Sequence, residues 1–180
     1  LLAATLIVAA TAANILYLQR LRTIPAEAPA PEPQPVVRRL SLLFTGDWMQ
    51  HTPQIAAART PSGFDYEPSF RHIAPLFRQA DLAFVNLETT LTRNRTYTGY
   101  PCFRSPAAVA DALKEMGVDV ALLANNHCCD GGSDGIRTTV EELDARGILH
   151  TGVFSDSTDY RRNRILRLER NGIRLAVVNY

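Results

Sequence analysis

Short apolar runs alternate with longer amphipathic stretches along this 180-residue chain. The apolar runs contain few polar interruptions, a pattern typical of strands that are buried on both faces of a largely parallel sheet. Such strands are predicted at Leu40–Thr45, Asp81–Leu87, Val118–Ala124 and Ile148–Val153.

Helical stripes of apolar residues lie between these runs. Helices are predicted across Phe64–Ala80, from Ser105 as N-cap to Gly117, and over Ser133–Arg146. Pro68 could open the first of them, and Pro75 would kink or divide it. The repeated strand–helix order predicts an α/β fold. Two further apolar runs flank Asn171-Gly172, a strong signal for a hairpin that would make the sheet mixed.

The beginning of the chain has a different composition from the rest. Residues 1–22 contain an uncharged apolar run, Leu1–Leu18, followed by Arg20 and Arg22. We expect either a membrane anchor or a secretory signal here, and the length favours the anchor. Residues 23–38 are rich in Pro and predict an extended linker. Residues 39–180 form the expected domain, and the apolar run that ends it predicts that the domain continues further.

Charge and cysteine content exclude several classes of protein. Lys and Arg total 19 against 18 Asp and Glu, so no bulk positive charge indicates a nucleic-acid partner. The three cysteines, Cys102, Cys128 and Cys129, are too few and too closely spaced for a disulfide scaffold or a zinc ribbon.

Polar residues follow directly after three of the predicted strands. Asp47 comes after the first, Asn86 and Glu88 end the second, and Asn126 and His127 follow the third. The carboxyl ends of parallel strands meet at one edge of a sheet, which is where ligands of α/β proteins usually bind. Each residue taken alone is also compatible with an ordinary polar turn or, for Asp47, with a helix N-cap.

Carboxylate, amide and imidazole groups together are a ligand set suited to Mn, Fe, Zn or Mg ions. His51, four residues after Asp47, could reach the same ion if a helical turn begins near Met49. Divalent ions held in this way can activate water and clamp a phosphoryl group. The loop before the second helix carries several arginines, and Arg104 in it could hold an anionic group, although solvated surface charge is the commoner explanation.

The motifs in this order resemble the CapA family of poly-gamma-glutamate capsule synthesis proteins, which is related to calcineurin-like metallophosphatases. The resemblance rests on GDWMQH at 46–51, NLE at 86–88, GYPCFRSP at 99–106 and ANNHCCDGG at 124–132. It covers about Leu40 to Tyr180. It implies an α/β/β/α sandwich of the metallophosphatase type, of which this chain would supply the N-terminal part after one apolar helix.

The resemblance also implies roles for single residues. Asp47, Glu88 and Asn126 would bind divalent metal ions, His127 and His51 would be catalytic, and Arg104 and Asn86 would contact the substrate. The chain departs from the family pattern where Met49 replaces a usual histidine ligand and where Glu88 replaces an aspartate.

The expected function is therefore capsule polymer synthesis or export at the cell surface, with a metal-dependent hydrolase or transferase site. The alternative is a non-catalytic, membrane-tethered binding component of a capsule assembly machine. The expected partners are an anionic polymer or phosphoester substrate, other capsule-synthesis membrane proteins, and the cell membrane, which a single N-terminal helix would cross with the domain outside the cytoplasm. No nucleic-acid partner is expected.

Overall fold

The computed structural model describes residues 2–22 and 35–180 of the chain. By its internal contacts the chain divides into two units, Leu1–Val37 and Arg38–Tyr180. The first unit contains helix α1, Leu2–Arg22, whose residues 10–20 are exposed. In the described part of the chain, no helix has the length and apolar character needed to cross a bilayer. The predicted anchor stays a prediction, and most of the predicted linker, 23–34, lies outside the described residues.

Four parallel strands form the central sheet of the second unit. They are β1 (Leu42–Trp48), β4 (Leu82–Leu87), β7 (Val120–Leu122) and β8 (Leu149–Thr151), and their order in the sheet is β1-β4-β7-β8. Each corresponds to one of the predicted strands, although β1 extends further, through Asp47, and β7 is shorter than the apolar run around it. The α/β class with a parallel central sheet is confirmed.

The two faces of β4 explain how the domain is built in layers. Ala83, Val85 and Leu87 face a large core that contains residues of α5 (Ala108–Met116) and α6 (Gly132–Ala145). Leu82 and Phe84 face a smaller core on the opposite side. Because successive strand residues point to opposite faces, one apolar strand can serve both cores. An ion pair between Arg146, at the end of α6, and Asp111 of α5 links these two helices.

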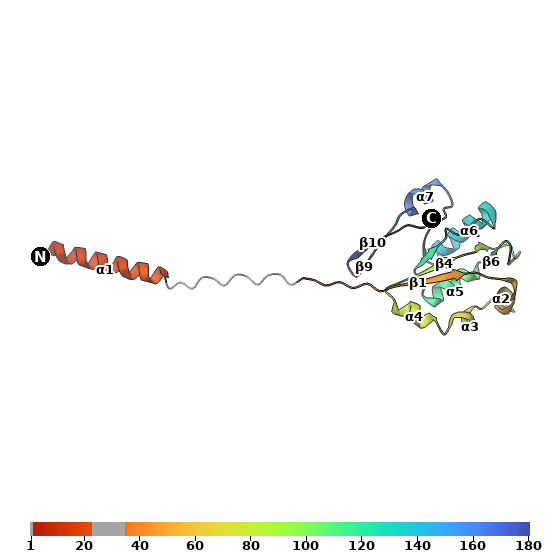
Figure 1. Ribbon diagram of the computed structural model, residues 1–180, viewed down its shortest axis with the longest axis horizontal. Coiled ribbons are helices and arrows are strands. Elements are labelled where there is room, and N and C mark those ends of the chain that lie inside the picture. The colour runs from red at the N-terminus through yellow and green to blue at the C-terminus, as the bar shows by residue number, and fades with distance from the viewer. Residues whose placement is uncertain (1, 23–34) are drawn as a thin grey trace. The chain divides into compact units, whose positions relative to one another are not determined.

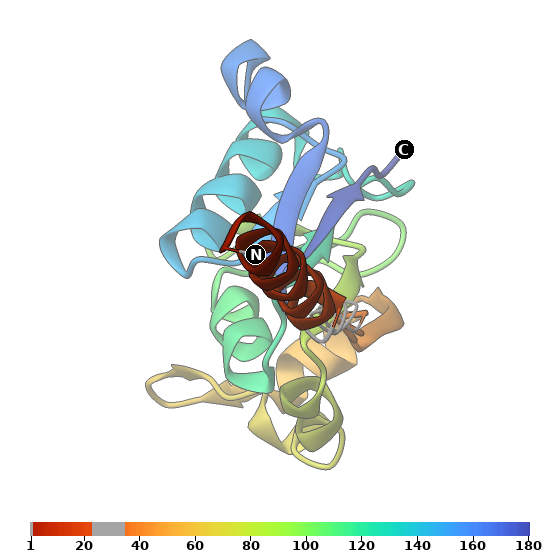
Figure 2. The ribbon, with the colours of Figure 1, turned by 90° about the vertical axis from the view of Figure 1, so that its left-hand side faces the viewer.

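An antiparallel hairpin covers the second face of the sheet. It consists of β9 (Leu166–Arg170) and β10 (Ile173–Val177), and its Leu166, Leu168, Leu175 and Val177 pack against the smaller core. The predicted turn is confirmed, since Asn171 and Gly172 have positive φ angles of 54° and 70°. The hairpin pairs with no strand of the central sheet among the described residues, so the expectation of a mixed sheet is wrong. Figure 1 shows it on the side of β1 opposite α5, and Figure 2 shows its two strands in blue.

Two predicted helices differ from those observed. The stripe at 64–80 is divided into α3 (Glu67–Phe70) and α4 (Ala74–Gln79), each with a proline in its first turn, as Pro68 and Pro75 predict. Helix α5 begins at Ala108 with Ala107 as its N-cap, so the expected Ser105 cap is wrong. Ser105 and Pro106 instead belong to β6, because pairing with β5 takes them into a ladder.

The remaining elements are short and connect these layers. They are α2 (Thr52–Ala57), β2 (Arg59–Thr60) paired with β3 (Gly63–Phe64), β5 (Thr90–Thr92) paired with β6 (Arg104–Pro106), and α7 (Ser157–Asn163).

Asp81 ties together three segments at the amino end of the sheet. Its carboxylate accepts hydrogen bonds from the backbone N–H and the hydroxyl of Ser41, both at 2.8 Å, and from the Asn171 side chain at 2.9 Å. These bonds stabilise the ionised form, so the pKa of Asp81 lies below its ordinary value, first because of the Ser41 backbone N–H.

We expect the stabilisation from Asp81 to be present at neutral pH and to disappear in acid. A lowered pKa means that this stabilisation holds above the ordinary value of 3.8 and is lost as the pH falls through the folded-state pKa. Thermal melts of Asp81→Ala should therefore lie below those of the wild type at neutral pH and should approach them in strong acid. Glu169→Ala removes an exposed acid of the β9–β10 hairpin and is the control. A difference in melting temperature that does not change with pH would contradict the prediction.

Candidate metal centre

An irregularity in β1 places Asp47 at the candidate site. Phe44 pairs with Phe84, and the next pair along the ladder is Asp47 with Asn86, so β1 advances three residues over a distance in which β4 advances two. An extra residue of this kind reverses the alternation of side chains beyond it. Asp47 is thereby brought to the same face as Asn86, whereas regular pairing would have pointed it to the opposite one.

The side chain of Asn86 joins two carboxylates at the tips of these strands. Its Nδ2 atom donates to Asp47 Oδ1 at 2.8 Å and to Glu88 Oε2 at 2.7 Å. Asn86 and Glu88 are two residues apart on one strand, and so they share a face. Three of the predicted site residues are therefore in contact with one another.

Glu88 is buried, with 9% of its surface exposed, and the negative charge of Asp47 is nearby. Burial is the main cause that raises the pKa of Glu88, and repulsion from Asp47 adds to it. The hydrogen bond from Asn86 and the proximity of His127 act in the opposite direction. Two carboxylates in such an arrangement repel each other, and a cation bound between them would remove the repulsion.

The loop after β7 adds an amide and an imidazole to this cluster. Asn125 Nδ2 donates to Asn86 Oδ1 at 3.1 Å and to the Leu87 carbonyl at 3.0 Å. Asn125 Oδ1 in turn accepts the backbone N–H of His127 at 3.1 Å. Asn125 therefore fastens the loop that carries His127 to the tip of β4.

The imidazole of His127 is oriented by a carboxylate. His127 Nδ1 lies 2.7 Å from Asp130 Oδ2, and both side chains are largely buried. The same carboxylate accepts the backbone N–H of Phe103, and Arg104 donates to the Asp130 carbonyl through Nε and Nη2 at 3.2 and 3.1 Å. This pairing leaves Nε2 of His127 as the ring nitrogen that can exchange a proton with a ligand.

The ring of Phe103 packs against both candidate histidines. Its ring centroid is 4.9 Å from that of His51 and 4.6 Å from that of His127, and both contacts are edge-on. His51 is the N-cap residue of α2, not part of a helical turn with Asp47, so the predicted helical face that would join them does not form. The structure thus places His51 beside the aromatic ring next to His127, and its catalytic role stays a prediction.

Asn125 contacts the cluster, and not Asn126, which the sequence favours. Asn126, the predicted amide ligand, is exposed, and within residues 35–180 no hydrogen bond of its side chain is found. Asn125 and Asp130 are the residues that sequence reasoning missed. Their spacing of two residues before and three residues after His127 is compatible with local side-chain bonds, but such spacing is common in polar loops.

The donor groups fit a hard divalent cation in their chemistry. Asp47 and Glu88 offer carboxylate oxygens, the ligands that Mg and Mn ions prefer, and their mutual repulsion favours a bound cation. Within the described parts of the chain, no group of three or more His, Cys, Asp or Glu residues is arranged to hold a metal ion. A metal at this centre would therefore be held by Asp47 and Glu88 together with neutral oxygen ligands.

The fold is an α/β domain with a parallel central sheet, consistent with the metallophosphatase-like class. The sequence profile of the family described as bacterial capsule synthesis protein PGA_cap matches residues 41–180. The chain belongs to this family, and the resemblance to CapA proteins is confirmed.

Characterised and uncharacterised relatives agree with this assignment. The capsule biosynthesis protein CapA of Bacillus anthracis is 27% identical over 186 residues, which cover 99% of this chain and 41% of that protein. The PGA biosynthesis protein CapA of Bacillus subtilis is 25% identical over 144 residues, 78% of this chain and 37% of that protein. An uncharacterized protein of Sinorhizobium fredii, y4sH, is 33% identical over 117 residues, 61% of this chain and 25% of that protein. The chain thus spans between a quarter and about two fifths of the length of these relatives.

Proposed function

We propose that this protein acts in the synthesis or export of an anionic capsule polymer of the poly-gamma-glutamate type, through a metal-dependent hydrolase or transferase centre at the tips of β1 and β4. The observation that carries the proposal is the meeting of Asp47 and Glu88 on one amide, Asn86 Nδ2, beside the oriented imidazole of His127. Membership in the capsule synthesis family supports the choice of polymer.

Each residue has a separate task in this proposal. Asp47 and Glu88 would hold the cation, which when bound would polarise a phosphoryl or carbonyl oxygen and activate water. Asn86 keeps the two carboxylates together through its shared hydrogen bonds. Asp130 fixes the His127 ring through Nδ1, so that Nε2 can give a proton to a leaving group or take one from a nucleophile.

The test compares turnover in the full protein and in His127→Ala. We expect manganese-dependent hydrolysis of an activated phosphodiester or of oligo-γ-glutamate, and a loss of about 10²–10⁴-fold in kcat in the variant, the range for removal of a general acid or base. Manganese affinity should change little, because the proposal gives the metal to Asp47 and Glu88. His72→Ala, an exposed histidine near α3, is the matched control.

One observation favours the alternative of a non-catalytic binding component. The predicted amide ligand Asn126 is exposed, and within the described residues no group of three or more His, Cys, Asp or Glu residues is arranged to hold a metal ion. If the full protein shows no turnover with either substrate, or if His127→Ala retains full turnover, the catalytic proposal is rejected and the binding role takes its place. Cell-surface tethering stays a prediction under either function.

A further inference from the structure

Two cavities adjoin each other on the side of the domain formed by β5, α5 and α6. The first has a volume of about 480 Å³ and is bordered by the β2–β3 hairpin, the loop after β5 and the start of α5. The second, of about 410 Å³, is bordered by the same loop and the start of α6. Thr92 and Arg93 border both cavities, so the two meet at these residues. Each volume lies within the range of about 300–1,000 Å³ that is typical of ligand sites.

Arginine side chains dominate the charged lining of both cavities. Arg59, Arg93 and Arg95 border the first, and the second has Arg93, Arg104 and Arg137. In the described part of the chain, a single acidic residue, Asp134, borders these cavities, and it is paired with Arg137. The lining therefore carries a strong excess of positive charge.

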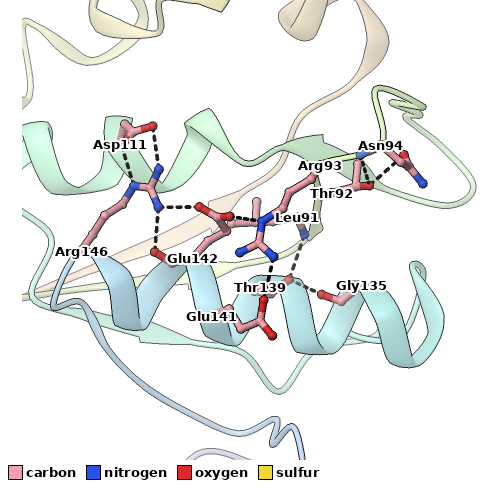
Figure 3. Close-up of polar contacts among 10 residues, drawn as sticks. All are labelled: Leu91, Thr92, Arg93, Asn94, Asp111, Gly135, Thr139, Glu141, Glu142 and Arg146. Carbon is pink, nitrogen blue, oxygen red and sulfur yellow. Dashed lines mark hydrogen bonds and ion pairs between the residues drawn. The ribbon is translucent and has the colours of Figure 1, made fainter.

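Contacts within the domain neutralise only part of this charge. Arg93 reaches from the end of β5 to α6, where it pairs with Glu141 at 2.7 Å and with Glu142, as Figure 3 shows. Arg59 lies over the ring of Phe64, 5.3 Å from its centroid, and so has no carboxylate partner there. Among the ion pairs of the described residues, none includes Arg59, Arg95 or Arg104.

Arg93 is held in place by a network that extends through both helices. Glu142 is 8% exposed and pairs with both Arg93 and Arg146, and Arg146 also pairs with Asp111 of α5. On α6, the Thr139 hydroxyl accepts a hydrogen bond from the backbone N–H of Leu91 at 2.8 Å. The wall shared by the two cavities is therefore rigidly supported, which lowers the entropy that a ligand would lose on binding there.

The first turns of both helices also border the cavities. Ala108 of α5 and its N-cap Ala107 border the first, and Gly135 of α6 and its N-cap Gly131 border the second. Neither helix has a side chain that caps its first backbone N–H groups. Such N–H groups and the helix dipole favour anions, and they add to the effect of the arginines.

We propose that these two cavities form one binding surface for an extended polyanion whose acidic groups contact Arg59, Arg95 and Arg104. Two adjoining cavities with cations at both ends suit a chain with repeated acidic groups better than a single small anion. Arg104 also contacts Asp130, the residue that orients His127, so a chain bound here would lead toward the candidate centre. The choice of a carboxylate chain as ligand rests on the proposed function, whereas the arginine surface does not.

The test measures binding of short oligo-γ-glutamate to the full protein without metal and in the presence of a chelator. We expect the Kd of Arg59→Gln/Arg95→Gln to rise by about tenfold or more, because each arginine makes a charge-assisted contact. Arg167→Gln/Arg174→Gln removes the same charge from exposed positions of the β9–β10 hairpin and should leave Kd within about twofold, since neither residue borders the cavities. In the wild type, the backbone N–H signals of Ala108 and Val109 should shift during an NMR titration.

Each outcome decides the inference separately from the proposed function. Three results would each reject the proposed binding surface. They are equal weakening of binding in both double variants, equal binding of a neutral oligo-γ-glutamine, and the absence of a shift at Ala108 and Val109. Tighter binding of polyphosphate than of oligo-γ-glutamate would confirm a polyanion surface and identify phosphate as the preferred group. Arginine-dependent binding without any turnover would support the arginine surface and reject the catalytic function. Turnover together with binding that does not depend on Arg59 and Arg95 would support the catalytic function and reject the arginine surface.

Discussion

Replacing Asp47 by Asn should weaken the binding of Mn²⁺ by at least about 100-fold. Loss of a residue that only supports a metal ligand typically costs 10–100-fold in affinity, and loss of a ligand itself should cost more. Asn keeps the shape and one oxygen of the side chain, so the hydrogen bond from Asn86 Nδ2 can persist while the charge is removed. Calorimetric titration of the full protein with Mn²⁺ measures the effect.

Glu88→Gln provides the second half of this test. This variant should weaken Mn²⁺ binding to a similar degree as Asp47→Asn. In the absence of metal, it should raise the melting temperature of the protein at neutral pH. The reason is that burial and Asp47 raise the pKa of Glu88, so the ionised wild-type side chain destabilises the folded state. The advantage of the variant should shrink as the pH falls through the folded-state pKa, where the wild-type Glu88 takes up its proton.

Glu115→Gln is the matched control for both variants. Glu115 is an exposed acid near the end of α5, and within residues 35–180 its side chain makes no ion pair, while its backbone carbonyl accepts from Arg78. Its replacement should change neither Mn²⁺ affinity nor the pH dependence of stability. If Asp47→Asn and Glu88→Gln bind Mn²⁺ as tightly as Glu115→Gln does, the strand-tip carboxylates are not a metal centre.

The second large effect is expected from Gly152→Ala, at the end of β8. Gly152 has a φ of 108°, and a Cβ at this position would lie 2.5 Å from the backbone N of Ala124 and would also meet the Asn179 side chain. Asn179 Oδ1 accepts the N–H of Ala124 at 2.7 Å, so the substitution strains the backbone and disrupts a partly buried hydrogen bond. We expect a loss of about 3 kcal/mol or more in the free energy of unfolding.

Gly147→Ala separates the two causes of this effect. Gly147 also has a positive φ, 63°, but open space surrounds its position. It should lose only the conformational part, about 1 kcal/mol. Urea denaturation of the two variants gives the difference, and equal losses would mean that the contact with Ala124 contributes nothing. Because Ala124 precedes Asn125, Gly152→Ala should also lower Mn²⁺ affinity.

The sequence identified the strands and the carboxylates at their tips because both follow from simple patterns. Apolar runs that end in polar residues predict buried parallel strands, and Asp47, Asn86 and Glu88 all lie at such ends. Their contacts confirm that the fold gathers them. The same pattern could not distinguish Asn125 from Asn126, because the direction of a side chain in a loop depends on its partners, here Asn86 and Leu87.

Tertiary pairing explains the other differences between expectation and structure. Ser105-Pro106 is a typical helix start, but the β5–β6 ladder takes up both residues and delays α5 until Ala108. Asp130 was overlooked because its role depends on Phe103 and Arg104, which are 26 or more residues away in sequence. Local patterns do not contain such long-range contacts.

The extra residue in β1 has a consequence for how this family can vary. A side chain added at Gly46 would meet no atom within 4 Å, so the identity of the residue there matters little. Regular pairing of the same residues would instead place Gly46 opposite Asn86 and turn the Asp47 carboxylate to the helical side of the domain, away from Asn86. Homologous proteins with the same number of residues between Phe44 and Asp47 should therefore keep the bulge, whichever residue stands at position 46.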